Sequence, residues 1–234
     1  MTVLFEGQNV TVRYGAVRAL EGVDIKVEPG VVHGIIGPNG AGKSTFIDAL
    51  SGRRRLINGK VLLRGEDISR RSVIWRRRNG ISRSFQTTSV FPSMTVREQL
   101  QMVGWRNNEP DITEIVEVLE LQGVLDTVCS EVAYGTQRSV DLAMALLGKP
   151  DVVLLDEPCA GLVASESIRT LQHIRSIAKE RNVGALVVDH NVDGIFSTCD
   201  VVSVLNLGEL LMTGDPQTVR KDPEVVKAYL GSAA

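Results

Sequence analysis

The chain has 234 residues, 43% of them hydrophobic, which is enough for one large domain or two small ones with a buried core. No apolar run approaches the roughly 20 residues that a membrane-spanning helix needs, and the first residues lack the basic start and apolar stretch of a secretory signal. We therefore exclude a membrane-spanning protein and expect a cytoplasmic chain, in which the three widely separated cysteines are unpaired thiols.

The formal net charge is −2, but positive charge concentrates in one segment: residues 53–83 hold eleven Arg or Lys against two acidic residues. Nucleic-acid surfaces usually interleave basic residues with several aromatics, whereas Trp75 is the one aromatic residue of this segment. Three interpretations of the segment stay open. They are a solvated surface, contact with a membrane protein or anionic headgroups, and nucleic-acid binding.

The first part of the chain predicts an antiparallel β unit followed by a strand, a loop and a helix. Alternating apolar residues at 10–14 and 23–27 indicate two strands separated by a turn at Gly15. A short apolar strand follows over residues 31–36, and a helix over residues 44–50 ends near Gly52.

The loop between that strand and that helix matches the phosphate-binding P-loop pattern in full. Its residues are Gly37, Pro38, Asn39, Gly40, Ala41, Gly42, Lys43 and Ser44. Glycines let successive backbone N–H groups curl around phosphate oxygens, and a helix N-terminus adds about half a positive charge. We predict that Lys43 reaches the β- and γ-phosphates of a nucleotide and that the Ser44 hydroxyl ligates Mg²⁺, with Thr45 next in the first helical turn.

The pattern becomes helical between about residues 87 and 148. It contains a capping box at Thr95–Glu98, a helical stretch over residues 112–121, and a helix over residues 136–147 that ends before Pro150. We interpret this region as a helical subdomain inserted into one α/β domain. The core of that domain would then comprise residues of about 1–86 and 149–234.

From residue 151 the chain returns to α/β alternation, with a helix over residues 165–181 and a last helix from about 223 to 230. The strand over residues 152–155 is buried on both faces and leads into two adjacent carboxylates, Asp156 and Glu157. At the carboxyl edge of a parallel sheet these side chains face the P-loop. We predict that Asp156 holds Mg²⁺, mostly through water, and that Glu157 orients and deprotonates the attacking water.

His190 follows the next buried strand, over residues 185–188, and is placed to hydrogen-bond the γ-phosphate from the far side. With this residue the motifs together resemble those of an ABC ATPase. The strings that carry the resemblance are the P-loop, Ser84-Phe-Gln86, Ala133-Tyr-Gly-Thr-Gln-Arg138, Asp156-Glu157-Pro158 and Asp189-His190.

Further strings, including Gly80 to Gln86 and Val225 to Gly231, are similar to the branched-chain amino acid importer ATPases. The similarity covers roughly residues 4–231. It implies a P-loop NTPase core of the ABC ATPase type, with an N-terminal antiparallel β subdomain and a helical subdomain.

The resemblance also implies roles for residues at the edges of the site. Tyr14 would stack on adenine, and Gln86 would sense Mg²⁺ and the attacking water. The signature loop would bind the γ-phosphate of the ATP held by the opposite subunit, and a helix starting near Thr136 would favour this anion through its free N–H groups. The loop residues are Ala133, Tyr134, Gly135, Thr136 and Gln137.

This signature loop departs from the common Leu-Ser-Gly-Gly-Gln sequence at Val132, Ala133, Tyr134 and Thr136. The missing hydroxyl at Ala133 removes one phosphate hydrogen bond, worth about 1.5 to 3 kcal/mol when the partner is charged. Val163 stands where the family usually has Asp or Asn. We therefore expect a paralogous ATPase as the dimer partner, with a second copy of this chain as the alternative.

By this resemblance the chain is the ATP-binding and ATP-hydrolysing motor subunit of an importer, with hydrophobic amino acids as the favoured cargo. Two ATPase subunits would close head to tail on two MgATP, and closure would pull on integral-membrane permease subunits that engage the cleft near Gln86 and Phe91. A periplasmic or extracellular substrate-binding protein would act indirectly. The chain would lie peripherally on the cytoplasmic face of the inner (plasma) membrane.

Other classes of protein share part of these motifs. Import of urea or small amides and export of lipopolysaccharide use related ATPases and stay open. A GTPase or small-molecule kinase is disfavoured because no Asn-Lys-x-Asp guanine motif occurs and a kinase has no need of the 133–138 loop. A soluble ABC ATPase acting on nucleic acid is disfavoured because the chain has neither a second ATPase domain nor a coiled-coil insertion, so we expect no nucleic-acid partner.

Overall fold

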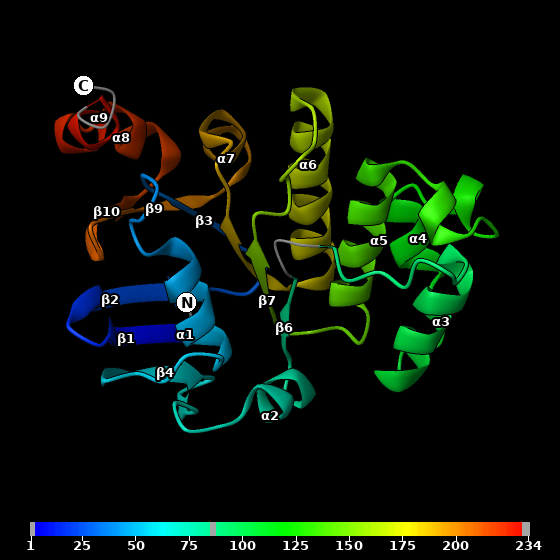
Figure 1. Ribbon diagram of the computed structural model, residues 1–234, viewed down its shortest axis with the longest axis horizontal. Helices are drawn as coiled ribbons and strands as arrows, with labels where there is room; N and C mark the ends of the chain where they lie inside the picture. The colour runs from blue at the N-terminus through cyan, green and yellow to red at the C-terminus, as the bar shows by residue number, and fades with distance from the viewer. Residues whose placement is uncertain (1–2, 85–87, 231–234) are drawn as a thin grey trace.

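The structure is a computed structural model that describes residues 3–84 and 88–230, and it contains two sheets (Figure 1). The smaller sheet is antiparallel, with strand order β2-β1-β4-β5. Its strands are β1 (Phe5–Tyr14), β2 (Val17–Val27), β4 (Asn58–Leu63) and β5 (Glu66–Asp67). The predicted N-terminal antiparallel unit is confirmed.

The larger sheet has the strand order β10-β9-β3-β8-β7-β6. Its strands are β3 (Val32–Ile36), β6 (Ile81–Arg83), β7 (Val152–Asp156), β8 (Gly184–Val188), β9 (Val201–Asn206) and β10 (Glu209–Gly214). In this sheet, β9, β3, β8, β7 and β6 each run parallel to the next strand. Strand β10 is antiparallel to β9. Every residue of β3, β7 and β8 is buried, as expected for parallel strands covered on both faces.

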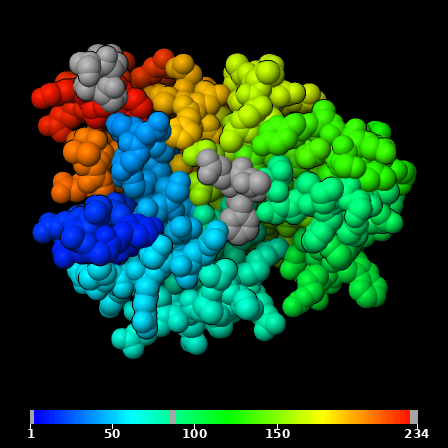
Figure 2. All heavy atoms as spheres, viewed as in Figure 1, coloured from blue at the N-terminus to red at the C-terminus, as the bar shows by residue number. Residues whose placement is uncertain are grey.

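Helices cover both faces of this parallel sheet. The described helices are α1 (Lys43–Ser51), α2 (Val73–Arg78), α3 (Val96–Arg106), α4 (Thr113–Val118), α5 (Tyr134–Leu146), α6 (Ala164–Arg181), α7 (Val192–Thr198), α8 (Pro216–Lys221) and α9 (Pro223–Leu230), with 3₁₀ turns at Gln122–Val124 and Cys129–Glu131. Helices α3 to α5 group at one side of the molecule, next to α6 (Figure 1). In the space-filling view this group and the C-terminal helices lie on opposite sides, with the segment around α1 between them (Figure 2).

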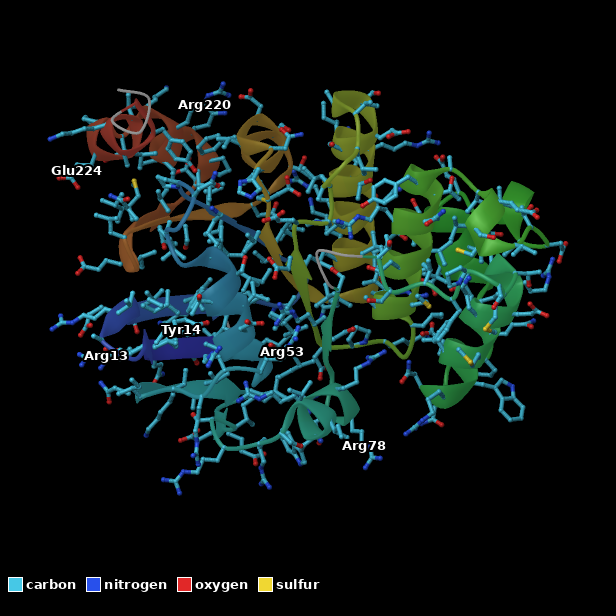
Figure 3. All side chains as sticks on the ribbon, in the orientation of Figure 1. Arg13, Tyr14, Arg53, Arg78, Arg220 and Glu224 are labelled. Carbon is cyan, nitrogen blue, oxygen red and sulfur yellow. The ribbon has the colours of Figure 1, made fainter. Side chains whose placement is uncertain are left out.

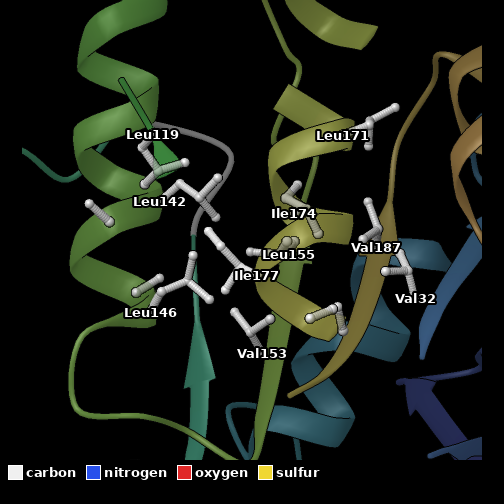
Figure 4. Packing of buried hydrophobic residues seen from close by; sticks show 14 of the residues in the cluster. Val32, Leu119, Leu142, Leu146, Val153, Leu155, Leu171, Ile174, Ile177 and Val187 are labelled. Atoms are coloured by element: carbon white, nitrogen blue, oxygen red, sulfur yellow. The ribbon is translucent and has the colours of Figure 1, made fainter. Parts of the chain in front are cut away.

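Two hydrophobic clusters lie on the two faces of the parallel sheet. Strand β7 sends Val153 and Leu155 into one cluster and Val152 and Leu154 into the other. The first cluster joins α5 and α6 to β7 and β8 (Figure 4). This single cluster extends from the helical group into the sheet, so it does not mark a boundary between them. The limits of about 87 and 148 for a helical subdomain therefore stay a prediction.

The three cysteines, at positions 129, 159 and 199, are free and buried, which confirms unpaired thiols. Burial is the main cause that raises the pKa of the Cys199 thiol to about 12, and it also raises the pKa of Cys159. These thiols therefore stay protonated and belong to the core. None of the helices among the described residues combines the length and apolar character needed to cross a lipid bilayer.

The basic segment of residues 53–83 contains four elements that the sequence pattern did not predict: β4, β5, α2 and β6. Arg76 is 2% exposed, and its guanidinium donates hydrogen bonds to the carbonyl oxygens of Leu50, Ile68 and Ser69. Burial lowers the pKa of Arg76 to about 10. At least one charge of this segment is therefore structural, whereas Arg53 and Arg78 are exposed, and Arg78 lies at the lower edge of the molecule (Figure 3).

Two predicted helix boundaries need correction. Helix α4 ends at Val118 rather than near residue 121, because Glu120 adopts a left-handed φ of 55° and the Leu121 N–H bonds back to the Val116 carbonyl at 2.9 Å. Helix α5 begins at Tyr134 rather than near Thr136. The predicted capping box is confirmed, since Thr95 and Glu98 exchange backbone and side-chain hydrogen bonds.

Candidate active site

The P-loop connects the end of β3 to the start of α1 and is packed tightly at both ends. A Cβ atom at Gly37 would lie 2.2 Å from the Leu205 carbonyl oxygen of β9, which is closer than any side chain allows. At Gly42, φ is 101° and a Cβ atom would lie 2.7 Å from the Ala19 carbonyl oxygen of β2. These glycines therefore let the loop pass close to two strands and lead into the N-terminus of α1, where free backbone N–H groups can bind phosphate.

Lys43 lies within the curve of this loop. Its Nζ donates to the carbonyl oxygens of Gly37 at 2.6 Å and Pro38 at 3.0 Å. Burial lowers the pKa of Lys43, while the charges of Glu157 and Asp156 oppose that shift. The ammonium group is thus held beside two carboxylates in a position from which it can reach bound phosphate.

A cleft of about 330 Å³ opens beside the P-loop. Its lining consists of Val17, Arg18, Ala19, residues 39–45, Glu157 and His190. The structure therefore brings together the P-loop, the proposed catalytic carboxylate and the histidine, which come from three separate parts of the chain. A concave site with convergent charged groups is suited to bind a nucleotide phosphate chain.

Asp156 ends strand β7 opposite the first turn of α1. Its Oδ1 lies 3.4 Å from the Ser44 Oγ, and its Oδ2 accepts a hydrogen bond from Arg83 at 2.9 Å. Burial raises the pKa of Asp156, and the Arg83 charge opposes this shift. Two hard oxygen ligands on facing elements fit Mg²⁺, which binds through few protein groups together with substrate phosphates. The prediction for Gln86 lies outside the described residues.

Glu157 is held in an uncommon backbone conformation, with φ of 53°. Its N–H donates to the Val188 carbonyl at 2.7 Å, and its own carbonyl accepts from Arg138 at 3.0 Å. Its Oε1 lies 2.9 Å from the His190 Nε2. Non-glycine residues in this region cost about 1 to 3 kcal/mol and gather at functional sites, so the neighbouring elements hold this carboxylate in place at the cleft.

Tyr14 is not part of the cleft lining. The Arg54 guanidinium stacks on its ring, with 4.3 Å to the ring centroid, and the residue is 40% exposed. Figure 3 places Tyr14 on the antiparallel sheet. Val17 and Arg18, from the neighbouring strand β2, line the cleft instead. Adenine stacking by Tyr14 therefore stays a prediction. Val17 and Arg18 were not identified from the sequence, and their only signal was their position just after the Tyr14-Gly15 turn.

The signature loop lies away from the P-loop cleft of the same chain. Ala133 is the N-cap of α5 and contributes no side-chain hydrogen bond to the helix end. The Glu166 carboxylate lies beside Gly135, where a Cβ atom would be 3.3 Å from its Oε1, and it accepts the Val163 N–H at 3.4 Å. Gly135 of the signature loop and Val163 therefore meet at Glu166, and Val163 is 62% exposed there.

A second, larger cleft of about 1,090 Å³ lies between β6 and the helices α3 and α5. Its lining includes the exposed side chains of Phe91, Met102 and Trp105, together with Arg77, Arg83 and Asp141. Trp105 is 80% exposed, which is unusual for so large an apolar side chain. This cleft contains the Phe91 segment that the sequence analysis associated with a permease.

Tyr229 is a further residue whose position sequence reasoning did not foresee. Burial raises the pKa of its hydroxyl to about 12, and the neighbouring backbone of Gly37 opposes that shift. Helix α9 thus contacts the first glycine of the P-loop from the far end of the chain. The string Val225 to Gly231 was noted only for its family resemblance, because no local pattern predicts a contact between such distant positions.

Comparisons with known proteins agree with these motifs. A family model described as ABC transporter matches residues 20–160, and one described as branched-chain amino acid ATP-binding cassette transporter matches residues 209–234. BraF of Pseudomonas aeruginosa, a high-affinity branched-chain amino acid transport ATP-binding protein, is 32% identical over 251 residues, covering 98% of this chain and 98% of that protein. LptB of Haemophilus influenzae, a lipopolysaccharide export system ATP-binding protein, is 31% identical and the match covers 97% of each chain.

A solved structure extends the similarity to three dimensions. The ADP conformation of MJ1267, an ATP-binding cassette of an ABC transporter, superposes with a TM-score of 0.89 at 28% identity, covering 99% of this chain and 100% of that one. The similarity in sequence and in fold therefore extends over nearly the whole chain.

Proposed function

The chain belongs to the ABC transporter family as an ATP-hydrolysing subunit, and we propose that it drives an importer for branched-chain or other hydrophobic amino acids. The observation that carries this cargo assignment is the match of residues 209–234 to the family model described for branched-chain amino acid cassettes. The similarity to BraF supports the same cargo class. The P-loop cleft supplies the ATP site of this motor.

In the proposed reaction, Lys43 binds the β- and γ-phosphates and Glu157 accepts the proton of the attacking water. His190, within 2.9 Å of Glu157, orients that carboxylate and hydrogen-bonds the γ-phosphate. Ser44 and Asp156 would hold Mg²⁺, which neutralises charge on the phosphates when it is bound. Gln86 and Tyr14 keep their proposed roles at the metal and the adenine.

The larger cleft is the proposed contact for the permease, which would place the chain at the cytoplasmic face of the membrane. We expect Phe91→Asp to abolish permease-stimulated ATPase and transport while basal ATPase persists, because a buried carboxylate in an apolar contact is unfavourable. Ile57→Asp is the matched control, since Ile57 is 61% exposed and lies outside that cleft. Unchanged transport by Phe91→Asp would contradict the proposal.

A second ATPase subunit completes each ATP site, and we propose that it is a paralogue. A homodimer would place the Ala133 signature in both sites, at a cost of up to about 3 kcal/mol each, or roughly a hundredfold in affinity. In a heterodimer, this chain's P-loop would meet a full signature. We expect turnover per site to rise when a purified paralogous ATPase is added, and equal cooperative turnover by the chain alone would rule out this need.

The cargo is tested by deleting the gene and measuring uptake of radiolabelled leucine, with urea uptake measured in parallel. Leucine uptake should fall and return with the wild-type gene, whereas a Lys43→Ala gene should not restore it. Loss of urea uptake alone would favour an amide importer.

Lipopolysaccharide export is the second candidate, because LptB matches 97% of this chain at 31% identity. In that case depletion of the protein would leave leucine uptake unchanged and reduce lipopolysaccharide at the cell surface. Surface labelling of the same depleted cells distinguishes the two functions.

A further inference from the structure

Arg83 contacts the ATP site and helix α1 and also lines the large cleft. Its Nη2 donates to the Asp156 Oδ2 at 2.9 Å, and its Nη1 donates to the Asp48 Oδ1 at 2.5 Å and the Ser51 Oγ at 2.9 Å. The same residue lines the large cleft that contains Phe91. Strand β6 thus connects the ATP site, helix α1 and the proposed permease contact through one guanidinium.

The burial of this arrangement makes it a strong constraint. The side chain of Arg83 is 10% exposed and that of Asp156 is 7% exposed. Buried charge pairs with charge-assisted hydrogen bonds hold fixed geometry, and the planar guanidinium fork serves both carboxylates at once. With Oδ2 occupied by Arg83, the other oxygen of Asp156 is the one that faces Ser44.

We propose that Arg83 is a positioning residue for the magnesium site, which fixes Asp156 with Oδ1 toward Ser44 and connects this carboxylate to the cleft beside Phe91. The inference rests on the proposed role of Asp156 as a metal ligand. Arg83 itself does not touch the metal; it orients the group that does. Partners that orient metal ligands typically contribute 10- to 100-fold to metal affinity.

The test measures binding of a fluorescent ADP analogue to the purified full-length chain while Mg²⁺ is titrated. For Arg83→Met we expect the Mg²⁺ concentration for half-maximal enhancement of binding to rise about 10- to 100-fold. Binding without Mg²⁺ should stay at the wild-type level, because the P-loop and Lys43 remain. Arg77→Met is the matched control: Arg77 lines the same cleft, but its guanidinium donates a hydrogen bond to the Leu147 carbonyl at 3.0 Å.

Two further variants keep the test decisive if Arg83→Met does not fold. Arg83→Lys retains the charge but loses the fork, and Asp48→Asn removes one anchor of the guanidinium; both should shift the Mg²⁺ dependence in the same direction by a smaller factor. A wild-type Mg²⁺ dependence in the folded Arg83 variants would overturn the proposal, provided that Asp156→Asn loses it. Equal loss of binding with and without Mg²⁺ would also overturn it, because that result indicates a structural role only.

The result also separates this inference from the proposed function. If Asp156→Asn keeps the wild-type Mg²⁺ dependence, the metal role of Asp156 is wrong and the positioning role falls with it. If Asp156→Asn changes the Mg²⁺ dependence of binding but Arg83→Met does not, Asp156 is a metal ligand and Arg83 does not position it.

Discussion

Replacing Glu157 with glutamine is expected to lower steady-state ATP hydrolysis by about 10²- to 10⁴-fold while ATP binding persists. Glutamine has the same shape but cannot accept the proton of the attacking water. The backbone N–H of residue 157 donates to the Val188 carbonyl and its backbone carbonyl accepts from the Arg138 guanidinium, so the substitution leaves that support intact. The lost step is therefore proton transfer rather than assembly of the site.

Phosphate release measures the turnover, and size-exclusion chromatography with ATP reveals whether bound nucleotide traps a closed dimer. Glu180→Gln serves as the control, because Glu180 is exposed on α6 and lies outside the cleft lining. Turnover by Glu157→Gln at the wild-type rate would show that another group activates the water.

Hydrophobic periodicity and glycine spacing were sufficient to predict the centre of the fold. The P-loop could be recognised because its glycines and lysine are required by local geometry, and the buried strand before Asp156 is a continuous apolar run. These signals are short-range. They predicted which residues lie at the carboxyl edge of the parallel sheet. At that edge, the structure places Glu157 and His190 in the lining of the P-loop cleft.

The segment of residues 53–83 was not predicted because its elements are short and partly exposed. Helix α2 has six residues and β6 has three, so neither supplies enough repeats for periodicity to emerge. The many arginines of this segment suggested an exposed surface. Arg76 is buried instead and donates hydrogen bonds to backbone carbonyl groups. The pattern of charge does not reveal which arginine is buried, since that depends on tertiary contacts.

Backbone conformations and long-range pairs were also beyond local reasoning. Glu120 and Glu157 adopt left-handed φ values that sequence rules reserve mainly for glycine and asparagine. The bond between Arg83 and Asp156 joins residues 73 positions apart. Such features follow from how strands and helices pack, which is why the link between the ATP site and the large cleft emerged only from the structure.

Lys43→Ala is expected to fail at an earlier step than Glu157→Gln. Charge-assisted hydrogen bonds contribute about 1.5 to 3 kcal/mol each, so loss of two bonds to the phosphates weakens MgATP binding by about a hundredfold or more. Lys60→Ala is the matched control, because Lys60 is exposed on β4. Equilibrium binding of a fluorescent ATP analogue gives the affinity directly.

We expect the two substitutions to have opposite effects on dimer formation. Glu157→Gln retains ATP and should accumulate a closed dimer, whereas Lys43→Ala should stay monomeric at ATP concentrations that saturate the wild type. In the double variant the Lys43 effect should dominate, because nucleotide must bind before hydrolysis can be blocked. Wild-type affinity for MgATP in Lys43→Ala would show that its Nζ, which donates to Gly37 and Pro38, supports the loop without contacting phosphate.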